Sequence, residues 1–367
     1  MPDPRLVKLA EVLVNFSTQV KQGDWVHITA GRQAVPLAKE VMARVLGAGG
    51  RPSVNLECDE LGEVYQKHAS DDQLAWISPV DDLIIEQCDV WIIIEAPENT
   101  RVMSAIPPEK QQARNKAYTG WVETYMKRSA SGKLRWVMTN YPCLALAQDA
   151  EMSLSDYQDF VFQATFCDQE DPIERWKELR KNQEKLVKWM DGKKKVEIKG
   201  ANADVSFSIE GRPFINSFGD QNMPSGEVFT SPVEDSVQGW VRFSYPAVYL
   251  GREVEGVRVE FEGGKVIKAS AEKNEDFLLA MLDTDDGARV LGEFGIGTNY
   301  GITRFTKDIL YDEKIGGSFH LALGGGFPEA GGANQSSIHW DLITDARQDT
   351  EIRVDGALFY KDGEFKV

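Results

Sequence analysis

The chain has 367 residues, which is enough for two domains and a large buried core. Hydrophobic residues make up 42% and charged residues 27%, a composition typical of soluble globular proteins and unlike that of disordered or fibrous chains. Acidic residues outnumber basic ones by 58 to 41, and the resulting net charge of −17 argues against binding to nucleic acid or to anionic membrane surfaces.

From the residue pattern we expect neither a targeting segment nor disulfide bonds. No stretch reaches the ~18 unbroken apolar residues of a membrane span. Lys8 and Glu11 interrupt the first sixteen residues, whose apolar positions instead follow helical spacing. The four cysteines form no Cys-x-x-Cys pair and are expected to be reduced thiols: Cys58, Cys88, Cys143 and Cys167. We therefore expect a cytoplasmic protein.

The first half of the chain alternates between strand and helix patterns. Short apolar runs predict strands at four places: Trp25–Ala30, Ser53–Cys58, Asp89–Pro97 and Leu134–Thr139. Helical patterns separate them, which favours an α/β domain with a mainly parallel sheet. A long charged helix from about Asp171 to Gly192 reads as the domain boundary, so we expect domains at residues 1–190 and 191–367.

The second half changes to period-two alternation with glycine turns, which predicts a mixed, mainly antiparallel α+β domain. Asp355-Gly356 and Asp362-Gly363 are typical of hairpin corners. One helix is expected at about Glu275–Thr284. Glycines are dense between Gly292 and Gly332, where the backbone must turn sharply or approach another group closely.

Common catalytic motifs are missing from the sequence. The loop after the first predicted strand has Gly31 but neither three spaced glycines nor a Gly-Lys-Ser/Thr sequence, so a nicotinamide or ATP enzyme is not supported. There is also no Gly-x-Ser-x-Gly elbow, and no cysteine has a nearby histidine in the sequence.

The four histidines are more informative. His27 lies in an apolar strand and fits a hydrogen-bonded core histidine, whereas His68 fits a solvated helix end. His339 and Asp341 are two residues apart in a strand pattern, so their side chains project from the same face. Together with His320 they could hold a divalent metal. The alternative is a pair of satisfied core histidines and a surface aspartate.

Three glutamates add possible oxygen ligands. Glu293 sits between glycines in an apolar segment, and Glu227 follows a Pro-Ser-Gly turn before Val228. An unpaired carboxylate is costly in such surroundings. Glu313 is more ambiguous, because its charged neighbours suggest a solvated loop. These groups could complete a two-metal site with a bridging carboxylate, which the histidines bias toward zinc, cobalt or manganese.

Four segments carry a resemblance to a known family: NMPSGEVFTSPVED, ARVLGEFGIGTN, ILYDEKIGGSFHLALGGGFPEAGG and NQSSIHWDLITD. The chain resembles the thermophilic aminopeptidase (aminopeptidase T) family of metallopeptidases over essentially its whole length. The resemblance implies an N-terminal α/β domain, a C-terminal domain with two divalent ions (zinc, cobalt, manganese or magnesium), and a homodimer enclosing the active sites. The metal ligands that it implies are Glu227, Glu293, His320, His339 and Asp341, with Glu293 bridging and Glu313 at or near the metals.

The resemblance predicts a metal-dependent aminopeptidase that acts on peptides through an activated water, with Glu227 or Glu313 as the general base. One departure is Phe327, which stands where the family commonly has a tyrosine, so a hydroxyl that could polarise the substrate carbonyl is lost. Two alternatives remain open. His320, His339 and Asp341 are also the ligand types of mononuclear iron ring-cleaving dioxygenases, which resemble this family, and a non-catalytic metal-binding dimer is the third hypothesis.

Overall fold

The computed structural model describes residues 3–367 and divides the chain into two compact units. The first contains the chain up to Ile173 together with Gly219–Met223, and the second contains Glu174–Phe218 and Pro224–Val367. Helix α10 (Pro172–Met190) corresponds to the charged helix that the sequence predicts at the domain boundary. From Glu174 onward it belongs to the second unit, where its Leu186 and Met190 join the hydrophobic core.

A five-stranded parallel sheet forms the centre of the first unit, in the order β2-β1-β3-β4-β8. Its strands are β1 (Trp25–Gly31), β2 (Arg51–Glu57), β3 (Val90–Glu95), β4 (Arg135–Asn140) and β8 (Asn222–Met223). The four strands predicted from apolar runs are all present, which confirms the α/β class of this half. The sequence did not reveal β8, a two-residue strand that pairs with β4 from far along the chain.

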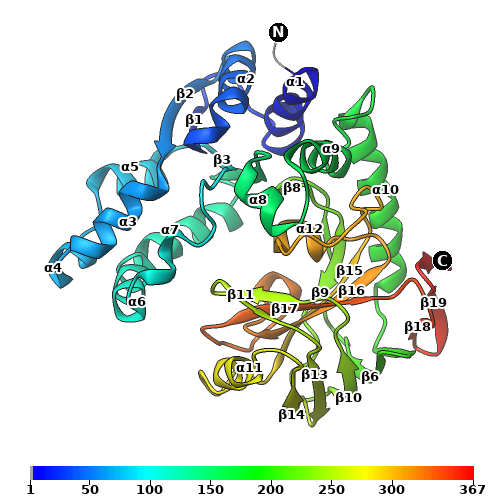
Figure 1. Ribbon diagram of the computed structural model, residues 1–367. Helices are drawn as coiled ribbons and strands as arrows, with labels where there is room; N and C mark the ends of the chain where they lie inside the picture. The colour runs from blue at the N-terminus through cyan, green and yellow to red at the C-terminus, as the bar shows by residue number, and fades with distance from the viewer. Residues whose placement is uncertain (1–2) are drawn as a thin grey trace. The chain divides into compact units, whose positions relative to one another are not determined.

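Helices connect these strands (Figure 1). They are α1 (Pro4–Glu11), α2 (Val35–Gly47), α3 (Asp59–His68), α4 (Asp71–Ala75), α5 (Pro79–Gln87), α6 (Pro108–Ala117), α7 (Thr119–Ala130), α8 (Leu144–Asp149) and α9 (Leu154–Ala164). Local sequence explains several of their starts. At the start of α1, the Asp3 carboxylate accepts a hydrogen bond from the backbone amide of Arg5. At the start of α4, Ser70 and Gln73 form a reciprocal capping box.

The second unit contains two large antiparallel sheets and a two-stranded one. The eight-stranded sheet runs β14-β13-β10-β6-β5-β18-β19-β20. Its strands are β5 (Lys195–Gly200), β6 (Ala203–Ser208), β10 (Gln238–Arg242), β13 (Arg258–Glu262), β14 (Lys265–Ser270), β18 (Thr350–Val354), β19 (Ala357–Lys361) and β20 (Glu364–Phe365). Asp355 and Gly356, both at positive φ, join β18 to β19, and Asp362 and Gly363 join β19 to β20, as predicted for hairpin corners.

The five-stranded sheet, which we call the ligand sheet, runs β17-β16-β15-β9-β7. Its strands are β7 (Ile215–Ser217), β9 (Glu227–Thr230), β15 (Leu291–Gly297), β16 (Ser318–Gly324) and β17 (His339–Asp345). The unit also contains the hairpin β11 (Ala247–Tyr249) and β12 (Arg252–Val254), and helices α11 (Glu275–Leu282) and α12 (Ile309–Asp312). This mixture of antiparallel sheets and short helices confirms the predicted α+β class.

Both large sheets of the second unit contribute to one hydrophobic core, in which the rings of Phe207 on β6 and Phe294 on β15 lie 5.0 Å apart. Every residue of β15 and of β16 is buried. Charged side chains on these two strands are therefore held away from solvent, where an unpaired charge is costly.

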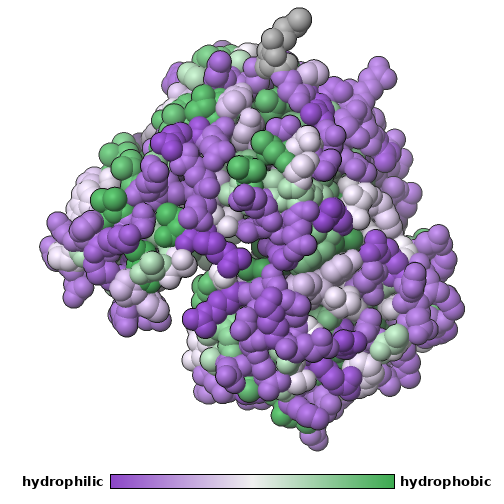
Figure 2. All heavy atoms as spheres, viewed as in Figure 1, coloured by the Kyte–Doolittle hydropathy of each residue, from purple (hydrophilic) through white to green (hydrophobic). Residues whose placement is uncertain are grey.

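The exposed surface is largely hydrophilic on the face that Figure 2 shows, with hydrophobic residues scattered among polar ones. Within residues 3–367, no helix has both the length and the apolar character needed to cross a membrane. The four cysteines are all free thiols, as expected from their spacing.

Candidate metal centre

Four adjacent strands of the ligand sheet bring five of the predicted ligands together. Glu227 begins β9, Glu293 lies on β15, His320 on β16, and His339 and Asp341 on β17. A β-bulge at Gly292 shifts the register so that Glu293 pairs with Ala322, which also pairs with Asp341. The five side chains come from segments that span more than a hundred residues of sequence.

The first group of candidate ligands contains Glu227, Glu293 and His320, all buried. The Nε2 atom of His320 lies 3.3 Å from Oε2 of Glu227 and 3.4 Å from Oε1 of Glu293. One imidazole nitrogen and two carboxylate oxygens thus converge within the spacing of a single metal coordination sphere.

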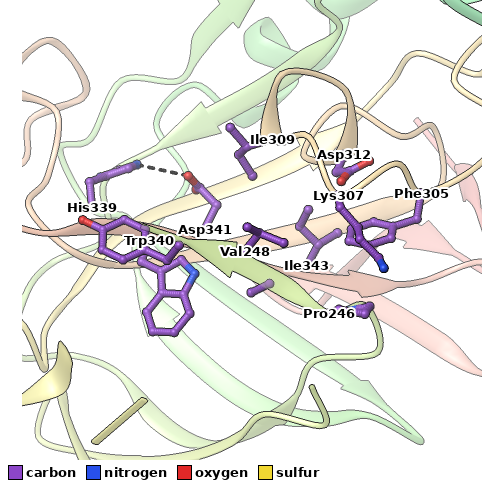
Figure 3. Close-up of a pocket in the computed structure, with 12 residues that line it drawn as sticks. Pro246, Val248, Phe305, Lys307, Ile309, Asp312, His339, Trp340, Asp341 and Ile343 are labelled. Carbon is purple, nitrogen blue, oxygen red and sulfur yellow. Dashed lines mark ion pairs between the residues drawn. The ribbon is translucent and has the colours of Figure 1, made fainter. Parts of the chain in front are cut away.

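The second group contains Glu293, His339 and Asp341. The Nε2 atom of His339 lies 3.1 Å from Oε2 of Glu293. It lies 3.6 Å from Oδ2 of Asp341, the pair joined by the dashed line in Figure 3. Its Nδ1 atom lies 2.8 Å from the carbonyl oxygen of Gly325, the contact that commonly leaves Nε2 of a histidine available to a metal. The side chain of Trp340 is buried in the hydrophobic core, as the strand alternation predicts.

Glu293 belongs to both groups and directs one carboxylate oxygen toward each histidine. This is the arrangement expected of a carboxylate that bridges two ions. The same strand also needs a glycine beside His320. A Cβ atom at Gly295 would lie 2.1 Å from Nε2 of His320. Only glycine at this position leaves room for the imidazole against β15.

The electrostatics of the two groups suit a bound cation. Three buried atoms have no hydrogen-bond partner: Oε2 of Glu227, Oδ1 of Asp341 and Nδ1 of His320. Burial raises the pKa of Glu227 to about 8 and that of Asp341 to about 6. A divalent ion in each group would compensate the carboxylates and give the unpartnered oxygens of Glu227 and Asp341 a partner, so the residues present fit a metal.

For the histidines and the shared glutamate, hydrogen bonds and charges outweigh burial: the pKa values of both histidines are raised, and that of Glu293 is lowered. Burial acts to lower the pKa of His320, but the hydrogen bond and charge of Glu293 outweigh it and raise that pKa to about 10. Burial likewise acts to raise the pKa of Glu293, but hydrogen bonds to His320 and His339 lower it to about 2. Positive charge beside Glu293 is thus favourable, and a metal held by these ligands would supply it.

Glu313, the sixth predicted ligand, belongs to neither three-residue group. Its carboxylate contacts Nζ of Lys314, which lies 3.7 Å from Oε1 of Glu227. The sequence-based interpretation of this segment as a solvated loop is wrong, since Asp312 is 2% exposed and Lys314 is fully buried. The apolar residues on both sides of this segment are the signal that could have indicated burial.

Lys314 is one of two site residues that the sequence analysis missed. Burial acts to lower its pKa, but the carboxylates of Glu313 and Glu227 outweigh that effect and raise it, so the ammonium stays charged. The other is Gln183 of α10, whose amide donates hydrogen bonds of 2.9 Å to the carbonyl oxygens of Ser217 and Glu227. It was missed because its neighbours form the charged pattern of a solvated helix face.

Phe327 lies at the site, as its place after the first histidine suggested. Its ring centroid is 4.8 Å from that of His339 and 5.4 Å from that of Phe229. The other two histidines belong to the first unit: His27 is buried beside the Ser53 hydroxyl, and His68 is exposed at the end of α3. Both match their predicted structural environments.

Comparison with known proteins agrees with this geometry. The model of the family described as thermophilic metalloprotease (M29) matches residues 2–365. Aminopeptidase 2 of Geobacillus stearothermophilus is 25% identical, with 99% of this chain and 95% of that protein covered. Aminopeptidase T of Thermus aquaticus is 27% identical, with 96% and 94% covered. The solved structure of wild-type AmpT from Thermus thermophilus superposes with a TM-score of 0.86 at 24% identity over 99% of both chains, which shows a shared fold. The chain thus belongs to the thermophilic metalloprotease (M29) family.

Proposed function

We propose that this protein is an aminopeptidase that hydrolyses N-terminal residues from peptides at a two-metal site. The observation that carries the proposal is the sharing of Glu293 between two groups of ligands. Membership of the metalloprotease family and the full-length similarity to aminopeptidases support the reaction class.

We assign Glu227, Glu293 and His320 to one ion and Glu293, His339 and Asp341 to the other. Mixed imidazole and carboxylate ligands suit zinc, cobalt or manganese, and magnesium is the remaining candidate. When bound, such ions supply a nucleophile by lowering the pKa of water and polarise the scissile carbonyl as Lewis acids.

The chain's own residues would handle the protons. Hydrolysis of a peptide bond requires a base that takes a proton from water and returns it to the leaving amine. We propose Glu313 for this role, because it lies outside both ligand groups and its side chain is 16% exposed. Lys314 would orient it through their direct contact, and Glu227 is the alternative base.

The test is elemental analysis of the purified protein together with hydrolysis of aminoacyl amides and dipeptides in added Zn²⁺, Co²⁺ or Mn²⁺. We expect two ions per chain and chelator-sensitive release of N-terminal residues. The double substitution His339→Ala/Asp341→Ala should remove one ion and abolish turnover, whereas His68→Ala, at an exposed position in the first unit, serves as the control. Full turnover in the double variant would refute the proposal.

The hypothesis of an iron dioxygenase has less support. It requires His320, His339 and Asp341 to converge on one ion, but among the described residues they fall into two different groups. One iron per chain without hydrolysis would favour it. Saturated metal sites with no hydrolysis of any peptide would favour the non-catalytic reading. The homodimer implied by the family resemblance is part of our proposal, and sedimentation of the purified protein tests it.

A further inference from the structure

A cavity of about 130 Å³ opens beside the second ligand group, entirely within the second unit (Figure 3). His339 and Asp341 form one end of it. Its walls come from the β11 hairpin, the segment leading into α12, and β17. The aliphatic and aromatic residues that line it include Val248, Phe305, Ile309 and Ile343.

The end of the cavity away from His339 is closed by charges that already have partners. The Lys307 ammonium lies 3.0 Å from Oε2 of Glu253. The buried Asp312 carboxylate accepts hydrogen bonds from the amide and the hydroxyl of Thr306, at 2.7 and 2.9 Å. The cavity thus has apolar walls, and both the ammonium of Lys307 and the carboxyl group of Asp312 at its far end have partners. A lysine or arginine side chain entering it would lose its hydration between apolar walls, which is costly for a charged group.

We propose that this cavity receives the side chain of the substrate's N-terminal residue and selects uncharged side chains of about leucine size. The inference rests on the proposed aminopeptidase function. A cavity of ~150 Å³ lined by aliphatic and aromatic residues accommodates a molecule as large as benzene. The volume here is therefore enough for a leucine or methionine side chain. Burying that side chain against the apolar walls is favourable.

The position of the cavity also determines how the peptide would be oriented relative to the two ligand groups. The side chain and the α-amine of an N-terminal residue are attached to the same carbon atom, so both lie at the His339 and Asp341 end of the site. The scissile carbonyl then faces Glu293, which joins the two groups. The leaving amine points toward Glu227 and Glu313, where the proposed base can protonate it.

The experiment compares kcat/KM for the amides of leucine, alanine and arginine with the metal-loaded protein. In the wild type we expect leucine to exceed arginine by at least about tenfold. Val248→Phe and Ile309→Phe each place a ring in the cavity and should reduce the leucine-to-alanine ratio by about tenfold or more. Ile267→Phe on β14 is the matched control, since Ile267 is an exposed aliphatic residue outside the cavity, and the ratio should not change.

Binding of leucinol, which has the amine and side chain but no scissile bond, provides a second readout by calorimetry. Its affinity should fall in Val248→Phe and stay at the wild-type value in Ile267→Phe. If the wild type hydrolyses these amides and both cavity variants keep the wild-type ratio, the inference is overturned while the proposed function stands. If the wild type releases no N-terminal residue with any metal, the proposed function itself fails, and this inference fails with it.

Discussion

Gly295 controls the position of His320, because the hydrogen of glycine is the only substituent that fits between β15 and the imidazole. In Gly295→Ala, the new methyl group must displace the ring from Glu227 and Glu293. We expect metal affinity to fall by at least about tenfold and the free energy of unfolding by about 1–3 kcal/mol. Elemental analysis after dialysis measures the first effect and urea denaturation the second.

The control for this substitution is Gly120→Ala in α7, where an added Cβ would meet nothing within 4 Å. It should keep the wild-type metal content. If Gly295→Ala also retained both ions at wild-type affinity, the assignment of His320 as a ligand would be wrong.

Lys314 supplies the positive charge beside Glu227 and Glu313. Removing one partner of a buried ion pair leaves an uncompensated charge, which costs about 3–5 kcal/mol. We therefore expect Lys314→Met to lower the free energy of unfolding by that amount in the metal-free protein. In the double variant Glu313→Gln/Lys314→Met, part of the loss should be recovered, because one of the stranded carboxylates is gone.

Urea denaturation of the single variants Lys314→Met and Glu313→Gln and of the double variant completes this mutant cycle. A coupling energy near zero would mean that Lys314 acts only as packing volume and that its contact with Glu313 contributes nothing to stability.

At the scale of structural elements, the loop before β17 depends on Asp285. Its carboxylate accepts hydrogen bonds of 2.8 Å from the Ser337 amide and from the Ser336 and Ser337 hydroxyls. These bonds, with the Ser337 amide first, lower the pKa of Asp285 to about 2. The loop runs directly into His339, so Asp285 helps to hold the second ligand group in place.

The depressed pKa determines how stability depends on pH. Asp285 binds its proton more weakly in the folded than in the unfolded protein, so its stabilisation is complete above about pH 4 and disappears as the pH falls toward 2. We expect Asp285→Asn to cost about 1 kcal/mol at pH 7 and less below pH 4. Urea midpoints at pH 7, 5, 4 and 3 measure the difference, with the exposed neighbour Asp286 changed to Asn as the control. A pH-independent difference would contradict the assigned cause.

At the scale of the whole molecule, the candidate metal centre joins side chains from four strands of the ligand sheet: β9, β15, β16 and β17. Ions that bind only the folded state stabilise it by ~2.7 kcal/mol at a hundred times their dissociation constant. We expect a chelator to lower the thermal midpoint by several degrees. Hydrogen exchange should become faster mainly in β9, β15, β16 and β17. The double variant His339→Ala/Asp341→Ala should respond less to the chelator, and an equal response would place the stabilising ions elsewhere.

Much of the fold was predictable because local periodicity reports on secondary structure. The runs that became β1 and β3 are apolar and β-branched, and the Asp-Gly pairs adopt the positive φ angles of hairpin corners. The two-residue repeat of a strand also predicted that His339 and Asp341 project from the same face, and their side chains do lie together. The segments that resemble the metallopeptidase family also identified every side chain that the structure brings into the two ligand groups.

Interactions between distant segments were decided only by the tertiary structure. The order of the strands and the bulge in β15 bring the Glu293 carboxylate within reach of both histidines, and no local pattern encodes that order. Lys314 appears in a run of charged residues, yet packing buries it against two carboxylates. The cavity beside Asp341 has walls from three separate segments. Sequence by itself determined the elements and the kinds of ligand, because these depend on neighbouring residues. Burial, charge pairing and the shape of the pocket depend on which elements meet, and only the folded chain decides that.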